Sequence, residues 1–300
     1  DDWLLKEDGS LHEESFGSLH DRAHAGRLGN VLTLNGAPHE TIPVRAGERI
    51  RLRLCNSCNS RILELKLEDV AAHVIARDGQ PVEPKPLEDG RLSLAPAQRI
   101  DLAVDMTGKP GSRSAIAEVS QGRVVAGIFA YHPSETRKRR EELLRLPANQ
   151  LSEPAADPAR KVDLIMTGGA MGGMERALFK GRELPIRELA RQHGMVWAFN
   201  GVAGMGEKPL FSVRKGESVE MRMVNDTRWP HAIHMHGHHF RQSDAAGGSS
   251  AAPWLDTILI ARDETATVRF VADNPGKWMI HCHMLEHQAA GMGTWFEVTG

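Results

Sequence analysis

The sequence lacks the features that mark several large classes of protein. No run reaches the roughly 18 apolar residues that a membrane-spanning helix requires. Lys and Arg number 37 against 39 Asp and Glu, so the charge balance gives no reason to expect a nucleic acid or a membrane as a partner. Three cysteines are too few for a disulfide scaffold. No signal peptide is visible at the start, so we expect a mature or truncated segment.

Aromatic residues are also sparse, with a single tyrosine, whereas histidine and methionine are abundant at 15 and 12. Imidazole, thioether and thiolate are the ligands that copper prefers. Abundance alone does not establish a metal site, so the positions of these residues decide the question.

Short apolar stretches separated by turn signals recur through the first half of the chain. Residues 50–54 and 62–67 alternate apolar and polar side chains, the period of a half-buried strand. Further strands are expected at 31–34, 91–94, 100–104, 115–119 and 124–131. Many short strands at close spacing favour an all-β sandwich with Greek-key connections over βαβ units.

Residues 134–160 differ from the segments on either side of them. A charge run at 137–142 and three prolines indicate a solvated linker, with a basic docking patch as the alternative. Beyond the linker, strands are expected at 162–166, 197–201, 210–213, 219–224, 258–260, 267–271, 278–282 and 294–298, with a short helix at 186–191. Both halves run from Asn-Gly through an apolar strand to Gly-Glu, which suggests one sandwich fold used twice.

Two clusters near the C-terminus carry metal-binding side chains. The first is His-Ala-Ile-His-Met-His at 231–236, and the second is His-Cys-His-Met-Leu-Glu-His at 281–287. Alternate residues of a strand point to opposite faces, so His281 and His283 should leave the sheet on one side and Cys282 on the other. One strand end would then serve two metal sites that lie back to back.

A thiolate, two imidazoles and a weak axial thioether form a blue-copper site. Cys282, His287 and Met292 provide three of these ligands from one loop, and His231 would provide the fourth from a neighbouring strand. Zinc also binds Cys and His, but it has no need of a single cysteine followed by a methionine. A purely structural role for two such clusters is the weaker interpretation.

The clusters match H-x-x-H-x-H and H-C-H-x-x-x-H-x-x-x-x-M, the signatures of the last domain of multicopper oxidases. The chain resembles the laccase-like, three-domain bacterial members of that family. This resemblance implies two cupredoxin-like Greek-key domains joined by the linker at 134–160. Residues 1–133 would correspond to the ligand-free middle domain, and residues 161–300 to the copper-bearing last domain.

The resemblance also implies a role for each ligand. The type 1 copper ligands would be His231, Cys282, His287 and Met292, the type 2 ligand His234, and the type 3 ligands His236, His281 and His283. Such enzymes couple one-electron oxidation of a substrate at type 1 copper to reduction of O2 to water. Electrons would pass from Cys282 through the main chain to His281 and His283. The substrate would be a phenol, an aromatic amine or a metal ion, and the location periplasmic or secreted.

One missing ligand set and one position depart from the family pattern, and a further position agrees with it. The trinuclear cluster needs two further H-x-H pairs from a first domain, which we expect in cis or as a separate chain. Gln288 stands where many relatives have an acidic residue, which puts the proton route through this position in doubt. Asp256 resembles a family position near type 1 copper, where it would accept a substrate proton or orient a ligand histidine.

Three functions therefore stay open. The first is a laccase-type oxidase completed by its first domain, and the second is an electron-transfer module that holds type 1 copper alone. The third is a copper-resistance protein that sequesters the metal, suggested by the methionines and extra histidines.

Other suggestive residues have weaker interpretations. His238 and His239 fit supporting or surface roles better than ligation. Cys55 and Cys58 have thioredoxin-type spacing but follow a strand, which favours two small packed residues over a disulfide or catalysis. The Gly- and Met-rich stretch at 168–174 is expected to be a flexible loop, not a phosphate-binding or copper-storage loop.

Overall fold

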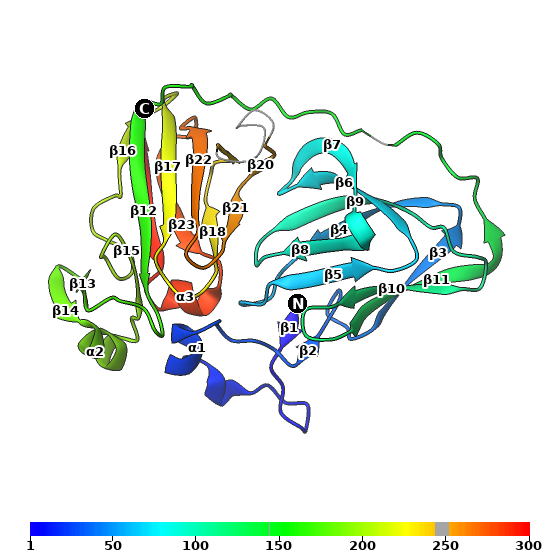
Figure 1. Cartoon of the computed structure of the whole chain (residues 1–300), viewed down its shortest axis with the longest axis horizontal. Coiled ribbons are helices and arrows are strands. Elements are labelled where there is room, and N and C mark those ends of the chain that lie inside the picture. Colours follow the sequence, from blue (N-terminus) through cyan, green and yellow to red (C-terminus); the bar gives the residue numbers. More distant parts are fainter. Residues whose placement is uncertain (144, 244–251) are drawn as a thin grey trace. The chain divides into compact units, whose positions relative to one another are not determined.

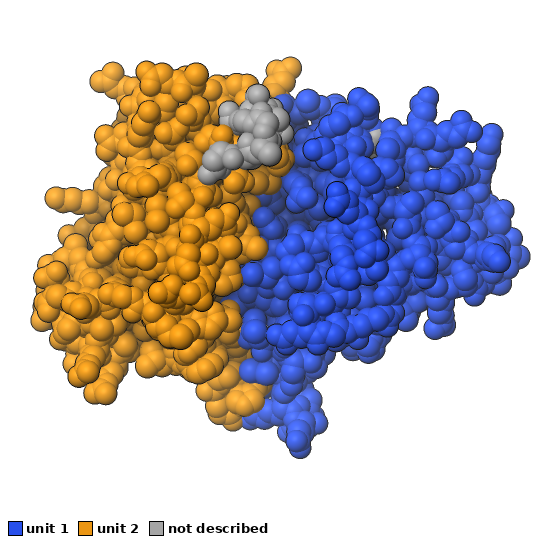
Figure 2. Space-filling model, in the orientation of Figure 1, with its two compact units in different colours: residues 1–11, 28–149 blue, residues 12–27, 150–300 orange. Residues whose placement is uncertain are grey.

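The structure, a computed structural model, describes residues 1–143, 145–243 and 252–300. Most of its regular elements are β-strands, which confirms the predicted all-β class (Figure 1). The chain forms two compact units, shown in separate colours in Figure 2. The first comprises Asp1–Leu11 and Leu28–Asn149, and the second comprises His12–Arg27 and Gln150–Gly300. No helix of the described residues is long and apolar enough to span a bilayer.

The first unit contains two main sheets, with strand orders β3-β11-β10-β5-β8 and β4-β9-β6-β7. The strands are β3 (Glu40–Ala46), β4 (Arg49–Cys55), β5 (Leu63–Leu67), β6 (Ala71–Arg77), β7 (Gln80–Pro86), β8 (Arg91–Leu94), β9 (Arg99–Asp105), β10 (Arg113–Glu118) and β11 (Val124–Thr136), with a 3-10 turn η2 (Glu88–Gly90) before β8. A two-stranded ladder joins β1 (Asp2–Trp3) to β2 (Val31–Leu32).

Alternation of apolar side chains builds the core of this unit. On β5, Leu63, Leu65 and Leu67 are buried, while the residues between them are partly exposed. They share one cluster with Leu102 of β9 and Phe129 of β11, so the cluster draws on both sheets. Burial of each such side chain contributes about 1.5–3 kcal/mol, which makes this sandwich core the main source of stability.

The strands expected from alternation in this unit are present, but three others of the unit were not predicted from the sequence. β3 contains Pro43, which removes a ladder donor, and it pairs in parallel with β11 through Ile42 and Phe129. β6 buries Val74, Ile75 and Ala76 in succession and so lacks a period of two. β7, which pairs with β6, also lacks that period.

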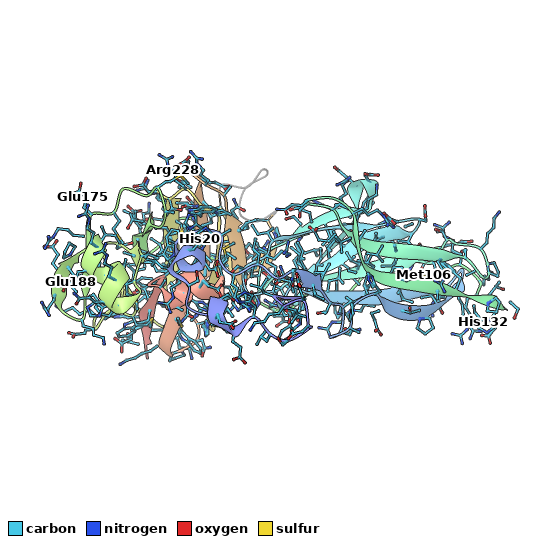
Figure 3. The ribbon with its side chains drawn as sticks, turned by 90° about the horizontal axis from the view of Figure 1, so that it is seen from below. His20, Met106, His132, Glu175, Glu188 and Arg228 are labelled. Atoms are coloured by element: carbon cyan, nitrogen blue, oxygen red, sulfur yellow. The ribbon has the colours of Figure 1, made fainter. Side chains whose placement is uncertain are left out.

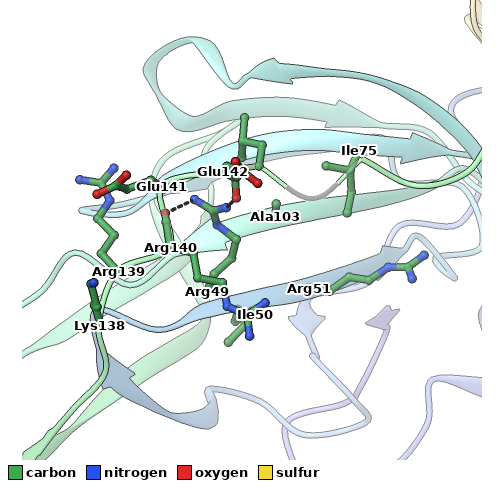
Figure 4. A pocket seen from close by; sticks show the side chains of 11 residues that line it. Arg49, Ile50, Arg51, Ile75, Ala103, Lys138, Arg139, Arg140, Glu141 and Glu142 are labelled. Carbon is green, nitrogen blue, oxygen red and sulfur yellow. Dashed lines mark hydrogen bonds between the residues drawn. The ribbon is translucent and has the colours of Figure 1, made fainter.

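The charge run of the expected linker lies along the first unit. Arg49 of β4 forms an ion pair with Asp105 at 2.6 Å and donates to the carbonyls of Arg140, at 3.1 Å, and Glu142 (Figure 4). Arg49, Arg140 and Glu142 border a cavity of about 680 Å³. The side chains at 137–142 are exposed, as expected of a solvated segment, while the main chain is held by Arg49.

The second unit has the same plan, with sheets of order β15-β12-β17-β22-β19-β20 and β16-β24-β23-β18-β21 and a hairpin β13-β14. The strands are β12 (Arg160–Gly168), β13 (Arg176–Phe179), β14 (Arg182–Pro185), β15 (Trp197–Phe199), β16 (Ser212–Arg214), β17 (Ser218–Asn225), β18 (His231–Met235), β19 (Phe240–Gln242), β20 (Trp254–Leu255), β21 (Thr257–Ile260), β22 (Thr265–Val271), β23 (Gly276–Cys282) and β24 (Gly293–Thr299). The helical segments are η1 (Glu13–Ser15), α1 (Leu19–Ala23), α2 (Ile186–Glu188), η3 (Leu189–His193) and α3 (Leu285–Ala289).

The two sheets of the second unit also pack face to face. On β17, which was predicted as a strand, Val219, Met221 and Met223 are fully buried at alternate positions. Phe270 of β22 and Phe296 of β24 meet across the sheets, with ring centroids 5.6 Å apart. The predicted helix at 186–191 is present as α2 and η3.

One segment from early in the sequence belongs to the second unit. Residues 12–27 include α1, which lies beside α3 (Figure 1). The Ser18 side chain caps α1 by accepting a bond from the Asp21 amide at 3.4 Å. The expected first domain, residues 1–133, therefore does not coincide with the first compact unit.

Candidate metal centre

Strand register divides the two histidine clusters between two faces of one sheet. β18 pairs with β23 so that Ile233 faces Cys282 and His234 faces His281. Residues that face each other across a ladder lie on the same side of the sheet, as do residues two apart on one strand. His231 and Cys282 therefore point inward together, while His234 and His281 lie on the opposite face.

The inward group brings together three of the predicted ligands. The Nδ1 atoms of His231 and His287 each lie 3.7 Å from Cys282 Sγ, and 3.1 Å from each other. All three side chains are fully buried. α3 begins just after β23 and returns His287 to the group, and the three ligand atoms are close enough to hold one metal ion.

Met292 is joined to this group through the main chain. Its amide donates to the His287 carbonyl at 3.0 Å, and its carbonyl accepts from the Cys282 amide at 3.2 Å. The Met292 side chain is fully buried. Met292, which precedes β24, is thus fixed next to Cys282 and His287, the two ends of the loop that carries these ligands.

Hydrogen bonds fix which nitrogen of each inward imidazole is available. His287 Nε2 lies 2.6 Å from the His24 carbonyl, which only accepts, so Nε2 carries the proton and Nδ1 the lone pair. His231 Nε2 lies 2.9 Å from Thr227 Oγ1. The Thr227 hydroxyl proton goes to a neighbouring oxygen, so Oγ1 accepts from His231. Both Nδ1 atoms therefore face the group as potential metal ligands.

Burial keeps all three inward side chains neutral. Burial raises the pKa of the Cys282 thiol to about 12. It lowers the pKa of His287 to about 4, against the opposing effect of the His24 carbonyl. Burial, with a smaller contribution from His287, also lowers the pKa of His231 well below its usual value. Near neutral pH, a metal ion would meet two deprotonated imidazoles and would have to displace one thiol proton.

Trp197 of β15 covers the inward histidines. Its ring centroid lies 4.6 Å from that of His287 and 5.0 Å from that of His231, and the side chain is fully buried. Sequence reasoning missed Trp197, Thr227 and His24. Trp197 and His24 lie far from the ligands in the sequence, and Thr227 lies four positions before His231 but in a turn, so no local motif marks them.

The outward group collects four histidines at the ends of β18 and β23. The ring of His281 lies 5.6 Å from His234, 5.2 Å from His236 and 5.5 Å from His283. The Nε2 atoms of His236 and His281 are only 3.1 Å apart. Two imidazole nitrogens that converge in this way are placed to share one metal ion.

Two of the outward histidines also have one nitrogen committed. His281 Nδ1 lies 2.9 Å from the Cys282 carbonyl and His234 Nδ1 lies 3.0 Å from the Asp256 carbonyl, so both Nδ1 atoms donate and both Nε2 atoms hold a lone pair. Burial lowers the pKa of His281 to about 4. His283 Nδ1 is buried without a hydrogen-bond partner among the described residues. A buried polar atom without a partner is unfavourable, and a bound metal would relieve it.

Asp256 lies with the outward histidines. Its carboxylate accepts from the Thr257 hydroxyl at 2.8 Å and lies 3.6 Å from His234 Nδ1 and 3.8 Å from His239 Nε2. By its resemblance to the family, Asp256 was expected near the type 1 group. β21 pairs Thr257 with His234, and Asp256, which lies between β20 and β21, is held beside His234 by the Thr257 hydroxyl and by its own carbonyl.

His238 fills an aromatic pocket next to the outward group. Its ring lies 5.3–5.7 Å from those of Phe270, Trp278 and Phe296, and Nδ1 approaches the His236 carbonyl at 3.4 Å. These contacts hold the main chain of His236, a supporting position of the kind expected from the sequence.

Cys55 and Cys58 are both free thiols, so they form no disulfide. Cys55 is exposed and Cys58 is buried. Burial, with a contribution from Asp2, raises the pKa of Cys58 to about 12, which leaves it unreactive. Both cysteines were expected to be packed, and this is correct for Cys58 but not for Cys55.

Comparison with known proteins identifies a single family. Residues 1–132 and 183–300 each match a sequence model described as multicopper oxidase. The multicopper oxidase MmcO of Mycobacterium tuberculosis is 29% identical over 253 residues, which cover 83% of this chain and 46% of that protein. The chain spans about half the length of the curated relatives that it matches.

Two solved structures match along nearly the whole chain. A multi-copper oxidase from Pseudomonas thermotolerans is 28% identical with a TM-score of 0.78, over 99% of this chain and 66% of that one. Lac15 from a marine microbial metagenome is 33% identical with a TM-score of 0.71, over 99% of this chain and 64% of that one. The cupredoxin-like sandwich fold predicted from the sequence is thereby confirmed.

Proposed function

Because the chain belongs to the multicopper oxidase family, we propose that it is the copper-binding part of a laccase-like oxidase. In this proposal residues 1–133 correspond to the middle domain of the family and residues 161–300 to its last domain. The observation that carries the proposal is the buried convergence of His231, Cys282 and His287.

The inward group would hold type 1 copper, with Cys282, His231, His287 and Met292 as ligands. The committed Nε2 atoms of both histidines support this assignment, because they leave both Nδ1 lone pairs facing the thiol. The chemistry that copper supplies in such enzymes is one-electron oxidation of a reducing substrate, coupled to reduction of O2 to water. Trp197 packs against both histidines and Cys282 is fully buried, which would keep water away from the thiolate.

The outward group would hold the other coppers, with His234 as a type 2 ligand and His236, His281 and His283 as type 3 ligands. The 3.1 Å approach of His236 to His281 and the unpartnered His283 nitrogen support a metal there. Asp256 would orient His234 through its main-chain carbonyl. Cys282 is bonded through the main chain to both His281 and His283, so covalent bonds connect the two groups.

The remaining ligands would come from a first domain that bears two H-x-H pairs, in cis or as a separate chain. The partners of the assembled enzyme would be O2 and a small reducing substrate such as a phenol, an aromatic amine or a metal ion. Gln288 cannot ionise, so protons would reach O2 by a route that does not use this position. We place the protein in the periplasm or outside the cell, as its family suggests.

A type 1 electron-transfer module is the alternative function for the chain alone. This chain supplies the whole type 1 set, which is the inward group together with Met292. The outward group offers only four of the eight histidines that a trinuclear cluster would need, and this contrast favours the module.

Copper counting on the purified chain tests the proposal. We expect about one firmly held copper per chain, with a strong visible Cys-to-copper band. Addition of the first domain should raise the count to about four and start O2 consumption. A chain that binds copper without the visible band would contradict the type 1 assignment. A count that stays near one beside the first domain would favour the module.

A further inference from the structure

The first unit contains a group of potential metal ligands of its own. One carboxylate oxygen of Asp1, one of Asp2 and the Sγ atom of Cys58 all lie within 4.8 Å of one another. Asp2 and Cys58 are buried, while Asp1 is partly exposed. Asp2 begins β1 and Cys58 lies in the turn after β4, so the group joins two segments that are distant in the sequence.

The main chain fixes the two carboxylates of this group. Asp2 pairs with Leu32 in the ladder of β1 and β2. The Asp1 carbonyl accepts from the Thr33 amide at 2.8 Å, which holds Asp1 on the same ladder. Asp1 Oδ1 accepts from the Asp2 amide at 2.8 Å, and this bond orients the Asp1 side chain. Both carboxylates are therefore held in place by local structure.

The thiol of the group is held by a separate set of buried bonds. The Asn56 side chain accepts from the Cys58 amide at 2.9 Å. Its amide nitrogen donates to the carbonyls of Arg61 and Leu94, at 2.8 Å and 2.7 Å. Cys58 belongs to the core cluster of the first unit, as does Met106, which Figure 3 labels. The turn that carries the thiol is thus fixed against the core.

One carboxylate oxygen of Asp2 has no hydrogen bond among the described residues. Asp2 Oδ2 accepts from the Gly29 amide at 2.6 Å and from Arg61 Nε at 2.8 Å. Asp2 Oδ1 is buried without a partner, and the whole side chain is only 1% exposed. Burial first, and then the nearby Asp2 carboxylate, raise the pKa of Cys58 to about 12. A cation between this carboxylate and the thiol would supply the partner that Asp2 Oδ1 lacks.

The surroundings of the group suit a small divalent ion. A cavity of about 80 Å³ borders Asp2, with Arg61 and Glu118 also on its wall. This volume holds roughly two water molecules, so water is available as a further ligand. Arg61 offsets the charge of Asp2, so Asp1 and a Cys58 thiolate would together match a divalent ion. The partly exposed Asp1 gives such an ion access from solvent.

We propose that Asp1, Asp2 and Cys58 bind a zinc ion in the first unit, with water at the fourth position. Zinc takes sulfur and oxygen ligands in tetrahedral geometry, and this group has neither the imidazoles nor the thioether that favour copper. On binding, the S–H bond of Cys58 breaks, an S–Zn bond forms and the proton passes to solvent. The ion ties β1 to the turn after β4. This site is independent of the function proposed above.

Cobalt(II) is the probe for this site, because it takes the ligands of zinc and absorbs strongly when a thiolate binds it. The chain has three cysteines, so in Cys282→Ser only Cys55 and Cys58 remain as sources of a thiolate-to-cobalt band. We expect the band in Cys282→Ser and in Cys282→Ser with Cys55→Ser, and no band in Cys282→Ser with Cys58→Ser. Excess zinc should remove it. A band that survives Cys58→Ser, or no band in Cys282→Ser, would overturn the site.

A second variant tests the carboxylate and leaves Cys58 in place, so it decides the question even where Cys58→Ser does not fold. In the Cys282→Ser chain, Asp2→Asn should weaken cobalt(II) binding about tenfold or more, because the oxygen beside the thiol loses its charge. Asp89→Asn is the matched control, because Asp89 is a carboxylate of the same unit that also accepts from an arginine. Equal affinities in Asp2→Asn and Asp89→Asn would exclude Asp2 as a ligand.

Discussion

At the scale of single residues, the side chains of the inward group are uncharged when no metal is bound. The thiol of Cys282 titrates far above neutral pH and the imidazole of His287 far below it, and burial is the main cause of both shifts. The metal-free chain therefore carries no unpaired charge at the bottom of this group, which explains how three polar side chains are buried together. Copper binding has to replace the thiol proton.

Copper(II) uptake should release about one proton per ion between about pH 6 and pH 8. The Cys282 pKa of about 12 lies above this window, so the thiol is protonated and loses its proton. The His287 pKa of about 4 lies below it, so this imidazole is already neutral and releases none. Affinity should therefore rise about tenfold per pH unit. Calorimetry in buffers of different ionisation enthalpy counts the protons, and a value near zero or near three would contradict the assigned states.

The proposed copper ligands could be picked out in the sequence because they fall in two short motifs. Their supports could not. His24 lies 263 positions before His287, and its carbonyl acts through the main chain, so its identity carries no signal. Thr227 is only four positions before His231, but the direction of its hydroxyl depends on a turn that the residue pattern does not specify.

At the scale of elements, the connection from α3 to β24 sets the position of Met292. Gly291 has a φ of 124°, a conformation that only glycine adopts readily. A Cβ added there would lie 2.2 Å from the Trp197 carbonyl oxygen, which belongs to the main chain of β15. The close approach of two main-chain segments therefore requires glycine.

Gly291→Ala should lower the free energy of unfolding by about 1–3 kcal/mol and shift the visible band of the copper-loaded chain, since the loop must move with Met292. Gly201→Ala is the matched control. Its φ is also positive, at 76°, but a Cβ there meets nothing within 4 Å. Denaturant titration and an absorption spectrum measure the two effects. An equal loss of stability and an unshifted band in both variants would show that the contact with Trp197 is unimportant.

Strands were predictable where one face is buried and the other is not. β5 and β17 alternate cleanly, and both were expected at nearly the observed positions. β6 is buried at consecutive positions and β3 contains a proline, so neither follows a period of two. An alternating sequence pattern identifies a strand that is buried on one face only. It does not identify strands such as β3 and β6, which are recognised by their hydrogen bonds to neighbouring strands.

At the scale of the whole molecule, the chain consists of two units with separate cores, and both metal groups belong to the second. That unit recruits residues 12–27 from the start of the sequence. Composition and spacing did not predict this, because the segment is held by bonds to its main chain. Because the inward and outward groups both lie in the second unit, removal of copper should destabilise that unit and leave the first unit unchanged.

Calorimetry of the metal-free chain should show two transitions, one for each unit. Copper(II) at about 100 times its dissociation constant stabilises the unit that binds it by about 2.7 kcal/mol. This should raise the midpoint of one transition by about 5–10 °C and leave the other unchanged. Equal shifts of both transitions would contradict a binding group that lies within the second unit alone.

The most direct test of the account is the visible spectrum of the chain with one copper(II) bound, compared with Cys282→Ser and with Cys55→Ser as the control. Cys282 Sγ lies 3.7 Å from the Nδ1 atoms of both inward histidines, whereas Cys55 is an exposed free thiol. We expect an intense Cys-to-copper band in the wild-type chain and in Cys55→Ser, and none in Cys282→Ser. A band that survives in Cys282→Ser would refute the type 1 assignment.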